Sequence, residues 1–177
     1  MGTQESLGLI QVYTGDGKGK TSAALGLAVR AAGWGMKTYM GQFMKGREYG
    51  ELRAVQALAP FITIEQYGRD GFVHVTGGTP EDIASARSGL EAASDALING
   101  EYDIVVLDEI NVALFFELLT VEEVLQVMDA KPPHVELILT GRRVPPELIE
   151  KADLVTEMRE VKHPYQQGIA ARRGIEY

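Results

Sequence analysis

Short apolar runs alternate along this chain with longer stretches in which apolar residues recur every three or four positions. The short runs predict buried strands and occupy residues 7–13, 38–43, 62–66, 104–107, 136–140 and 154–158. Helical periodicity is clearest over residues 80–99, where Thr79 is a good N-cap, Pro80 takes the first helical position, and the pattern stops at Asn99.

Two further stretches also predict helices. An alanine-rich pattern covers residues 23–32, and a helix is expected from Thr120, with Glu123 three residues later, to about residue 130. Strands that alternate with helices indicate an α/β fold with a mainly parallel sheet and helices on both faces.

Length and composition are those of one globular domain spanning residues 1–177, with 45% hydrophobic residues. The chain lacks an apolar run of about 18 residues, and its first residues do not resemble a signal peptide, so we expect a cytoplasmic protein without a membrane segment. The absence of cysteine excludes disulfides, thiolate metal sites and a cysteine nucleophile. The net charge of −8 argues against nucleic acid as a partner.

A glycine-rich loop between the first strand and the first helix predicts a phosphate-binding site. It reads Thr14-Gly15-Asp16-Gly17-Lys18-Gly19-Lys20-Thr21-Ser22. Glycines let backbone amides point inward, Lys20 supplies a charge, and Thr21 offers a hydroxyl to a divalent metal at the helix N-terminus. Thr14 replaces the usual first glycine, and Lys20 stands where a dinucleotide pattern needs its third glycine. The context favours a nucleoside triphosphate over a plain surface turn.

An acidic pair, Asp108 and Glu109, follows the strand predicted at residues 104–107. P-loop proteins hold Mg²⁺ with acids in this position, opposite the loop threonine. One acid would ligate or orient the metal, and the other could hold a metal-bound water or a ribose hydroxyl; the sequence does not divide these roles. A pair of acids that only complements a helix dipole is the structural alternative.

Ligands of parallel α/β sheets bind at the carboxyl ends of the strands. Other segments that follow predicted strands are therefore candidates, namely Met44-Lys45-Gly46-Arg47, residues 68–79 and Thr140-Gly141-Arg142-Arg143. Because the chain is acidic overall, an anionic nucleotide needs local positive charge, for which Lys18, Lys20, Arg30, Arg142 and Arg143 are candidates.

Several of these motifs together resemble the P-loop ATP:corrinoid adenosyltransferases, also called cob(I)alamin adenosyltransferases. The similarity covers nearly the whole chain and lies in the loop at residues 14–21, Gln42-Phe43-Met44-Lys45-Gly46, Val105-Val106-Leu107-Asp108-Glu109-Ile110-Asn111, Thr140-Gly141-Arg142, Glu157-Met158-Arg159-Glu160-Val161-Lys162-His163-Pro164-Tyr165 and Gly174-Ile175-Glu176-Tyr177. A threonine at the position of Thr14 is itself typical of the loop in this family.

The resemblance implies a RecA-like P-loop fold and a reaction in which Co(I) of cob(I)alamin or a cobinamide attacks the 5′ carbon of ATP and releases triphosphate. It also implies that ATP is held in the reverse of the usual orientation, with Mg²⁺ or Mn²⁺. Lys20, Phe72 and Glu109 are then expected at the reacting groups, Thr21, Asp108 and Glu109 at the metal, and Arg30 and Arg142 at the triphosphate. A homodimer is implied, and a flavoprotein reductant and an adenosylcobalamin-dependent client enzyme are candidate partners.

The corrinoid pocket departs from the family pattern. A Gly-Phe-x-Trp stretch of the family reads Gly71-Phe72-Val73-His74 here. By resemblance Phe72 lies beneath the corrin, where it keeps the lower axial ligand away and eases reduction of Co(II). His74 is expected to form a smaller polar wall of the pocket, with coordination of cobalt as the alternative.

Two other functions use the same loop. One is an ordinary P-loop phosphotransferase such as a small nucleoside kinase, and the other is a carrier or sensor that binds nucleotide or adenosylcobalamin without turnover. A GTPase is disfavoured because the chain lacks an Asn-Lys-x-Asp motif.

Overall fold

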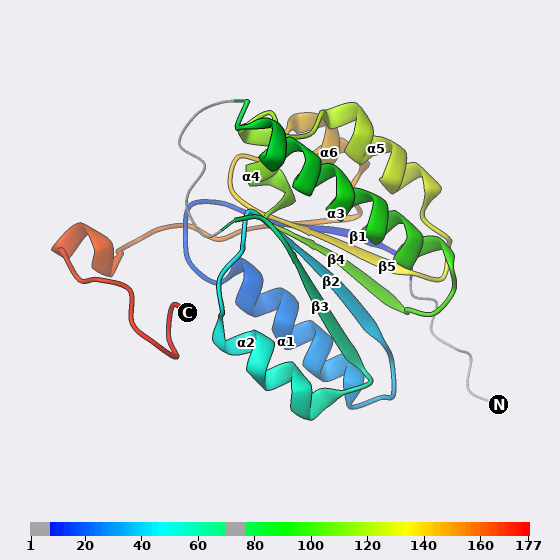
Figure 1. The fold of residues 1–177 in the computed structure, drawn as a ribbon, viewed down its shortest axis with the longest axis horizontal. Helices are drawn as coiled ribbons and strands as arrows, with labels where there is room; N and C mark the ends of the chain where they lie inside the picture. The colour runs from blue at the N-terminus through cyan, green and yellow to red at the C-terminus, as the bar shows by residue number, and fades with distance from the viewer. Residues whose placement is uncertain (1–7, 70–76) are drawn as a thin grey trace.

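The computed structural model describes residues 8–69 and 77–177 and has a six-stranded sheet with the strand order β3-β2-β4-β5-β1-β6 (Figure 1). The strands are β1 (Ile10–Thr14), β2 (Thr38–Phe43), β3 (Ile62–Tyr67), β4 (Ile104–Asp108), β5 (Glu136–Thr140) and β6 (Leu154–Glu157). Every neighbouring pair is parallel. The α/β prediction is confirmed, and each strand expected from the apolar runs is present.

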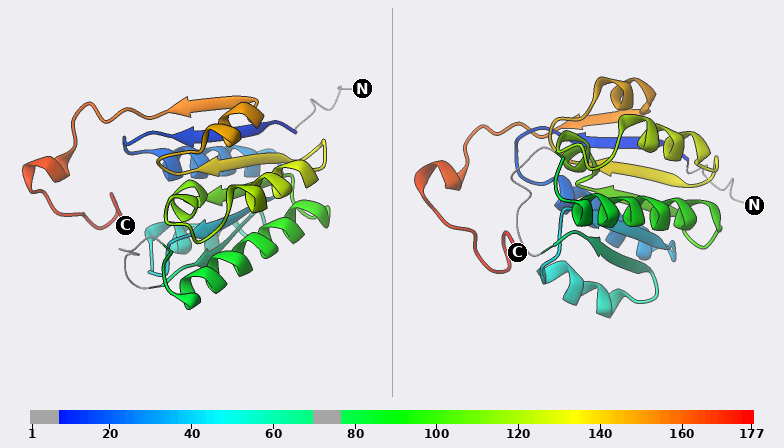
Figure 2. Two further views of the ribbon diagram at one scale, coloured as in Figure 1. Left: turned by 90° about the horizontal axis from the view of Figure 1, so that it is seen from above. Right: turned by 45° about the horizontal axis from the view of Figure 1, so that its top comes forward.

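Helices cover both faces of this sheet (Figures 1 and 2). One face carries α1 (Lys20–Ala32), with α2 (Gly50–Ala54) beside it, and the other carries α3 (Pro80–Ile98), α4 (Ile110–Phe115), α5 (Val121–Ala130) and α6 (Pro146–Lys151). Successive residues of β4 alternate between the two layers: Ile104 and Val106 join the core under α1, while Val105 and Leu107 join the larger core under α3 and α5.

The ends of the long helices follow from their caps. Thr79 and Asp82 form a reciprocal capping box at the start of α3, and Thr120 and Glu123 form the same arrangement at α5, as the sequence predicted. The helix expected at residues 23–32 begins earlier, at Lys20, because the glycine loop leads directly into its first turn. The short helices α2, α4 and α6 were not predicted, since five or six residues are too few to establish a periodicity.

The register of the sheet brings the ends of distant strands together. Tyr13 is paired with Thr140 and Gln42 with Asp108, so the segments that follow β1, β2, β4 and β5 emerge at one edge. After β6 the chain leaves the sheet, passes through a short 3-10 helix, η2 (Pro164–Gln167), and returns toward the start of α1 (Figure 1). Each helix in the described residues is too short or too polar to cross a membrane.

Candidate nucleotide-binding site

The loop between β1 and α1 is shaped by glycine and by the chain that follows β6. Gly15 and Gly19 have φ angles of 93° and 120°, which residues with a side chain rarely adopt. The Gly17 amide donates a hydrogen bond to the Met158 carbonyl at 2.6 Å, and a Cβ atom on Gly17 would lie 2.6 Å from the same oxygen. Glycine is therefore required where the loop packs against the segment that follows the edge strand.

Lys20, the first residue of α1, lies almost fully buried against this loop. Its Nζ atom donates hydrogen bonds to the carbonyl oxygens of Gly15 at 2.7 Å and Gly17 at 2.8 Å. Burial lowers the pKa of Lys20, and attraction to Glu109 partly opposes that effect. Within residues 8–69 and 77–177 no carboxylate bonds to the ammonium group, so its charge is available to an anionic ligand.

Asp108 is the centre of a buried polar cluster at the carboxyl end of β4. Its Oδ1 atom accepts hydrogen bonds from the hydroxyls of Thr21 at 2.8 Å and Thr140 at 2.7 Å. Its Oδ2 atom accepts from Lys45 Nζ at 2.9 Å and from Gln42 Nε2 at 3.3 Å. The side chain is completely inaccessible to solvent, and its charge is compensated by Lys45 and three neutral donors.

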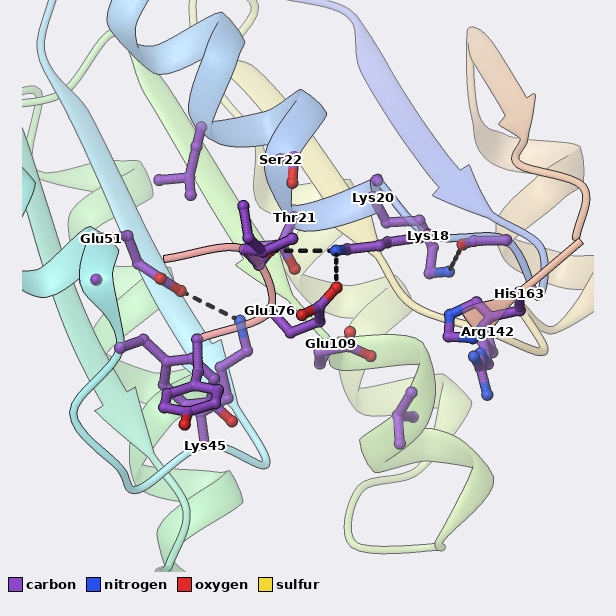
Figure 3. Close-up of a pocket in the computed structure, with 18 of the residues that line it drawn as sticks. Lys18, Lys20, Thr21, Ser22, Lys45, Glu51, Glu109, Arg142, His163 and Glu176 are labelled. Atoms are coloured by element: carbon purple, nitrogen blue, oxygen red, sulfur yellow. Dashed lines mark hydrogen bonds and ion pairs between the residues drawn. The ribbon is translucent and has the colours of Figure 1, made fainter. Parts of the chain in front are cut away.

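Glu109 follows Asp108 but faces the cavity instead of the core (Figure 3). Its backbone is left-handed, with φ of 63°, and its amide donates to the Thr140 hydroxyl at 2.9 Å. This turn directs two consecutive carboxylates to different environments. Burial, together with repulsion from Asp108, raises the pKa of Glu109, whereas Lys45 and Lys20 act in the opposite direction.

The exit from β5 packs closely against α4. Gly141 has φ of 130°, and a Cβ atom there would lie 2.9 Å from Cβ of Asn111. Asn111 is buried and donates from Nδ2 to the Gly141 carbonyl at 3.1 Å. Its Oδ1 atom has no hydrogen-bond partner among the described residues. This packing fixes the backbone from which the next residue, Arg142, extends.

Arg142 connects the segment after β5 to the glycine loop. Its Nη2 atom donates to the Asp16 carbonyl at 3.1 Å, and its Nε atom lies 3.9 Å from Asp16 Oδ1. Arg143 has a left-handed backbone, and its guanidinium lies 4.0 Å from the centre of the Phe115 ring. The two arginines therefore line the cavity from the β5 side, one near the loop and one near an aromatic side chain.

These elements enclose a cavity of about 750 Å³, large enough for a nucleotide together with part of a second ligand. Its walls come from the glycine loop and α1, the segment after β2, α4, the segment after β5, and the C-terminal segment (Figure 3). The charged and polar side chains around it are those of Lys18, Lys20, Thr21, Ser22, Lys45, Glu51, Glu109, Arg142, Arg143, His163 and Glu176.

The C-terminal segment closes one side of the cavity. Lys18 Nζ donates to the Ile175 carbonyl at 3.1 Å and forms an ion pair with Glu176 at 2.8 Å. Glu176 also accepts from the backbone amide of Arg172 at 2.7 Å and from its guanidinium at 3.0 Å. Hydrogen bonds from Arg172, followed by that from Lys18, lower the pKa of the Glu176 carboxyl to about 2. Gly174 and Tyr177 line the cavity beside these residues.

Most of the residues singled out in the sequence meet at this cavity, and a few do not. Gly17, Lys18, Gly19, Lys20, Thr21, Ser22, Glu109 and Arg142 line it, while Thr14, Gly15, Asp16 and Asp108 support them from the loop and the core. Arg30 lies exposed in the last turn of α1 and is not part of the lining. Phe72 and His74 lie outside the described residues.

Several site residues were not singled out individually from the sequence. Lys45 belongs to a segment that was marked because it follows a strand, but its ion pair with Asp108 was not predicted. Gln42 and Thr140 complete the same cluster from two other strands. For both Gln42 and Thr140, the feature of the sequence that could have indicated this role is a polar residue near the end of a strand predicted to be buried. His163 carried no signal of its own beyond its place in a family motif.

Comparison with known proteins agrees with this geometry. Residues 6–177 match the family model of the ATP:corrinoid adenosyltransferase BtuR/CobO/CobP. The chain belongs to this family. The corrinoid adenosyltransferase of Pseudomonas aeruginosa is 37% identical over 175 residues, which cover 98% of this chain and 86% of that protein.

Two enterobacterial relatives lead to the same assignment. The corrinoid adenosyltransferase of Escherichia coli is 37% identical over 174 residues, 98% of this chain and 88% of that protein. The corrinoid adenosyltransferase CobA of Salmonella typhimurium has the same identity and coverage. The resemblance stated from the sequence motifs is thus confirmed, and it extends along the chain from the glycine loop to the C-terminal segment that packs on it.

Proposed function

We propose that this protein transfers the 5′-deoxyadenosyl group of ATP to Co(I) of a corrinoid and releases inorganic triphosphate. The observation that carries the proposal is the cavity lined by the Thr21 hydroxyl, the Glu109 carboxylate and the Lys20 ammonium, which has no carboxylate partner among the described residues. Membership of the ATP:corrinoid adenosyltransferase family supplies the two substrates.

The reaction needs little acid–base chemistry from the protein. The cobalt electron pair forms a bond to the 5′ carbon, the bond from that carbon to the phosphate oxygen breaks, and its electrons remain on the departing triphosphate. Negative charge that develops on this leaving group would be stabilised by Lys20, whose ammonium is held at the glycine loop by the carbonyls of Gly15 and Gly17 before the reaction begins. The protein's main contribution is to position ATP and the corrinoid relative to one another.

Mg²⁺ fits the donors present in the cavity. Thr21 and Glu109 line the cavity with a hydroxyl and a carboxylate, and the buried Asp108 accepts a hydrogen bond from the Thr21 hydroxyl at 2.8 Å, so it would orient that ligand from the core. Oxygen donors of this kind suit Mg²⁺ or Mn²⁺, whereas the described residues contain no group of three or more His, Cys, Asp or Glu side chains that would form a metal site on its own. When bound, the metal would neutralise charge on the polyphosphate.

The corrinoid side of the cavity is supported by the residues that flank positions 70–76. On the side before position 70, Gly46 packs against the backbone of Arg69, so Arg69 lies near Lys45. On the side after position 76, the Gly77 amide donates to the Phe116 carbonyl at 2.8 Å. Lys45 and Phe116 both line the cavity. The roles given to Phe72 beneath the corrin and to His74 as a pocket wall remain predictions.

Other parts of the proposal rest on the family relationship. They are a homodimer, a cytoplasmic location in cobalamin biosynthesis or salvage, a flavoprotein that supplies the reductant, and a client enzyme that uses adenosylcobalamin. Size-exclusion chromatography with light scattering tests the dimer directly. The phosphotransferase and carrier alternatives lose support because the relatives are named adenosyltransferases.

The decisive experiment is anaerobic incubation of the protein with Mg-ATP and chemically reduced cob(I)alamin, followed by the visible spectrum and an assay of triphosphate. Adenosylcobalamin formed together with equimolar triphosphate would support the proposal, whereas ADP as the product would indicate a phosphotransferase, and ATP binding without transfer would indicate a carrier.

The Lys20→Ala variant should lose about one to two orders of magnitude in turnover, because one charge-assisted hydrogen bond contributes about 1.5 to 3 kcal/mol. Gly26→Ala is a suitable control, since Gly26 is exposed on the same helix and a Cβ atom there meets no neighbour within 4 Å. Unchanged turnover in Lys20→Ala would contradict the role given to this side chain.

A further inference from the structure

We infer that His163 is a binding residue for the polyphosphate of ATP and donates a hydrogen bond to it from Nε2; the inference rests on the proposed function. His163 precedes η2 and lies outside the P-loop, the acidic pair and the arginines that a nucleotide site of this kind normally uses. It nevertheless lines the same cavity as Lys20 and Arg142.

The orientation of the imidazole ring is fixed by a local hydrogen bond. His163 is the N-cap of η2, and its Nδ1 atom accepts a hydrogen bond from the Tyr165 amide at 3.2 Å. An Nδ1 atom that accepts must be unprotonated, so the neutral ring carries its hydrogen on Nε2. Pro164 follows directly and restricts the backbone at this position. The cap therefore determines both the tautomer and the direction of the ring.

The Nε2 donor has no hydrogen-bond partner within the part of the chain that the structure describes. The ring is partly exposed and lines the same cavity as Lys20 and Arg142, and Figure 3 shows these three side chains in the same part of the view. Lys20 and Arg142 are bonded there to backbone carbonyls of the loop. Two cations and an unpaired N–H donor that line one cavity suit an anion with several acceptor oxygens.

The position of His163 is also coupled to the loop itself. Met158, five residues earlier, accepts a hydrogen bond from the Gly17 amide at 2.6 Å and donates to the Thr14 carbonyl at 2.8 Å. The segment that carries His163 therefore starts from the backbone that shapes the phosphate loop. A polyphosphate that occupies the loop would meet this donor without a change in the fold.

Two substitutions separate the binding role from the capping role. In His163→Asn the side-chain oxygen can still accept from the Tyr165 amide, but the side chain no longer reaches the cavity as far as imidazole Nε2. In His163→Gln the amide N–H₂ group can occupy the place of Nε2, while the cap is lost. His134→Asn serves as the control, because His134 is exposed in the turn before β5, at the opposite end of that strand from the cavity.

The experiment measures binding of inorganic tripolyphosphate and of ATP, both with Mg²⁺, by isothermal titration calorimetry. His163→Asn is expected to bind tripolyphosphate roughly tenfold more weakly than the wild type, and His163→Gln within about threefold of it, since a hydrogen bond to a charged group is the difference between them. The reverse order, or equal affinity in His163→Asn and wild type, would overturn the inference and leave His163 a cap only.

Adenosyl transfer assayed alongside keeps the two proposals distinguishable. A wild-type protein that binds tripolyphosphate with the expected order of variants but forms no adenosylcobalamin would refute the proposed function and support the role of His163. A wild-type protein that forms adenosylcobalamin while His163→Asn binds tripolyphosphate normally would refute only the role of His163. A wild-type protein with no affinity for tripolyphosphate would also refute it.

Discussion

Replacing Asp108 by Asn tests whether the buried cluster is held together by charge. The substitution keeps the shape of the side chain but removes its negative charge, and one of the two carboxylate oxygens becomes an N–H₂ donor. Since Oδ2 faces Lys45 and Gln42, which are both donors, the new amide must place its nitrogen toward Thr21 and Thr140. The ammonium of Lys45 then loses its closest counterion.

The size of the effect follows from burial and from what remains near Lys45. Removing one partner of a buried ion pair costs about 3 to 5 kcal/mol. Lys45 keeps a contact with Glu51 at 3.6 Å and lies 5.1 Å from the centre of the Tyr49 ring, and the amide still accepts one hydrogen bond from it. The lower end of the range, about 3 kcal/mol, is therefore expected, which corresponds to a fall in Tm of about 6 to 12 °C for a chain of this length.

Urea denaturation and thermal melts of Asp108→Asn, Lys45→Met and the double variant measure this directly. Because the cost comes from an uncompensated charge, the double variant should be less destabilised than the sum of the two single variants by about 1 to 3 kcal/mol. A Tm of Asp108→Asn within about 1 °C of the wild type, or additive effects in the double variant, would refute the reasoning.

Three other predictions concern single residues. Glu109→Gln should stabilise the protein relative to the wild type increasingly as pH rises, because the raised pKa of Glu109 favours folding only while the carboxyl is protonated. Urea denaturation at pH 5 and 8 measures the difference in unfolding free energy, and a difference that does not change with pH would contradict the prediction. Gly141→Ala should cost about 1 to 3 kcal/mol in unfolding free energy through its positive φ and close packing, whereas Gly26→Ala should gain up to about 1 kcal/mol; equal melting temperatures would contradict both. The ion pair between Glu176 and Lys18 should persist above pH 4.5 and be lost as pH falls through about 2, where the Glu176 carboxyl takes up its proton; NMR titration of the carboxyl measures its pKa, and a midpoint near 4.5 contradicts the contact.

The sequence was sufficient for the sheet and for the loop, because both depend on local patterns. Apolar runs marked every strand, and the reciprocal caps at Thr79 and Thr120 marked the starts of α3 and α5. The sequence also predicted that Thr21 and Asp108 lie close together. Asp108 stands at the end of one parallel strand, and Thr21 lies in the first turn of the helix that follows another, so both come to the same edge of the sheet.

The remaining features of the site depend on contacts that no local pattern encodes. Lys45 reaches Asp108 across 63 positions, and Lys18 reaches Glu176 across 158. Arg30 is exposed because it lies in the last turn of α1, away from the loop that leads into the first turn. The family pattern alone did not show this, since an arginine at position 30 agrees with that pattern. To predict such contacts one must know the register of the sheet and the path of the C-terminal segment. The pattern of apolar and polar residues along the chain gives neither.

The place of β1 in the sheet has a consequence for biosynthesis. Of the six strands, the one that leads into the glycine loop is the first to leave the ribosome, yet its neighbours are β5 and β6, the last two of the six to be made. Until residue 157 has emerged, β1 has no partner on its outer side, and the loop lacks the backbone of Met158 that shapes it. Nascent or truncated chains should therefore be unable to retain nucleotide, and their unpaired β1 would be the surface that chaperones protect.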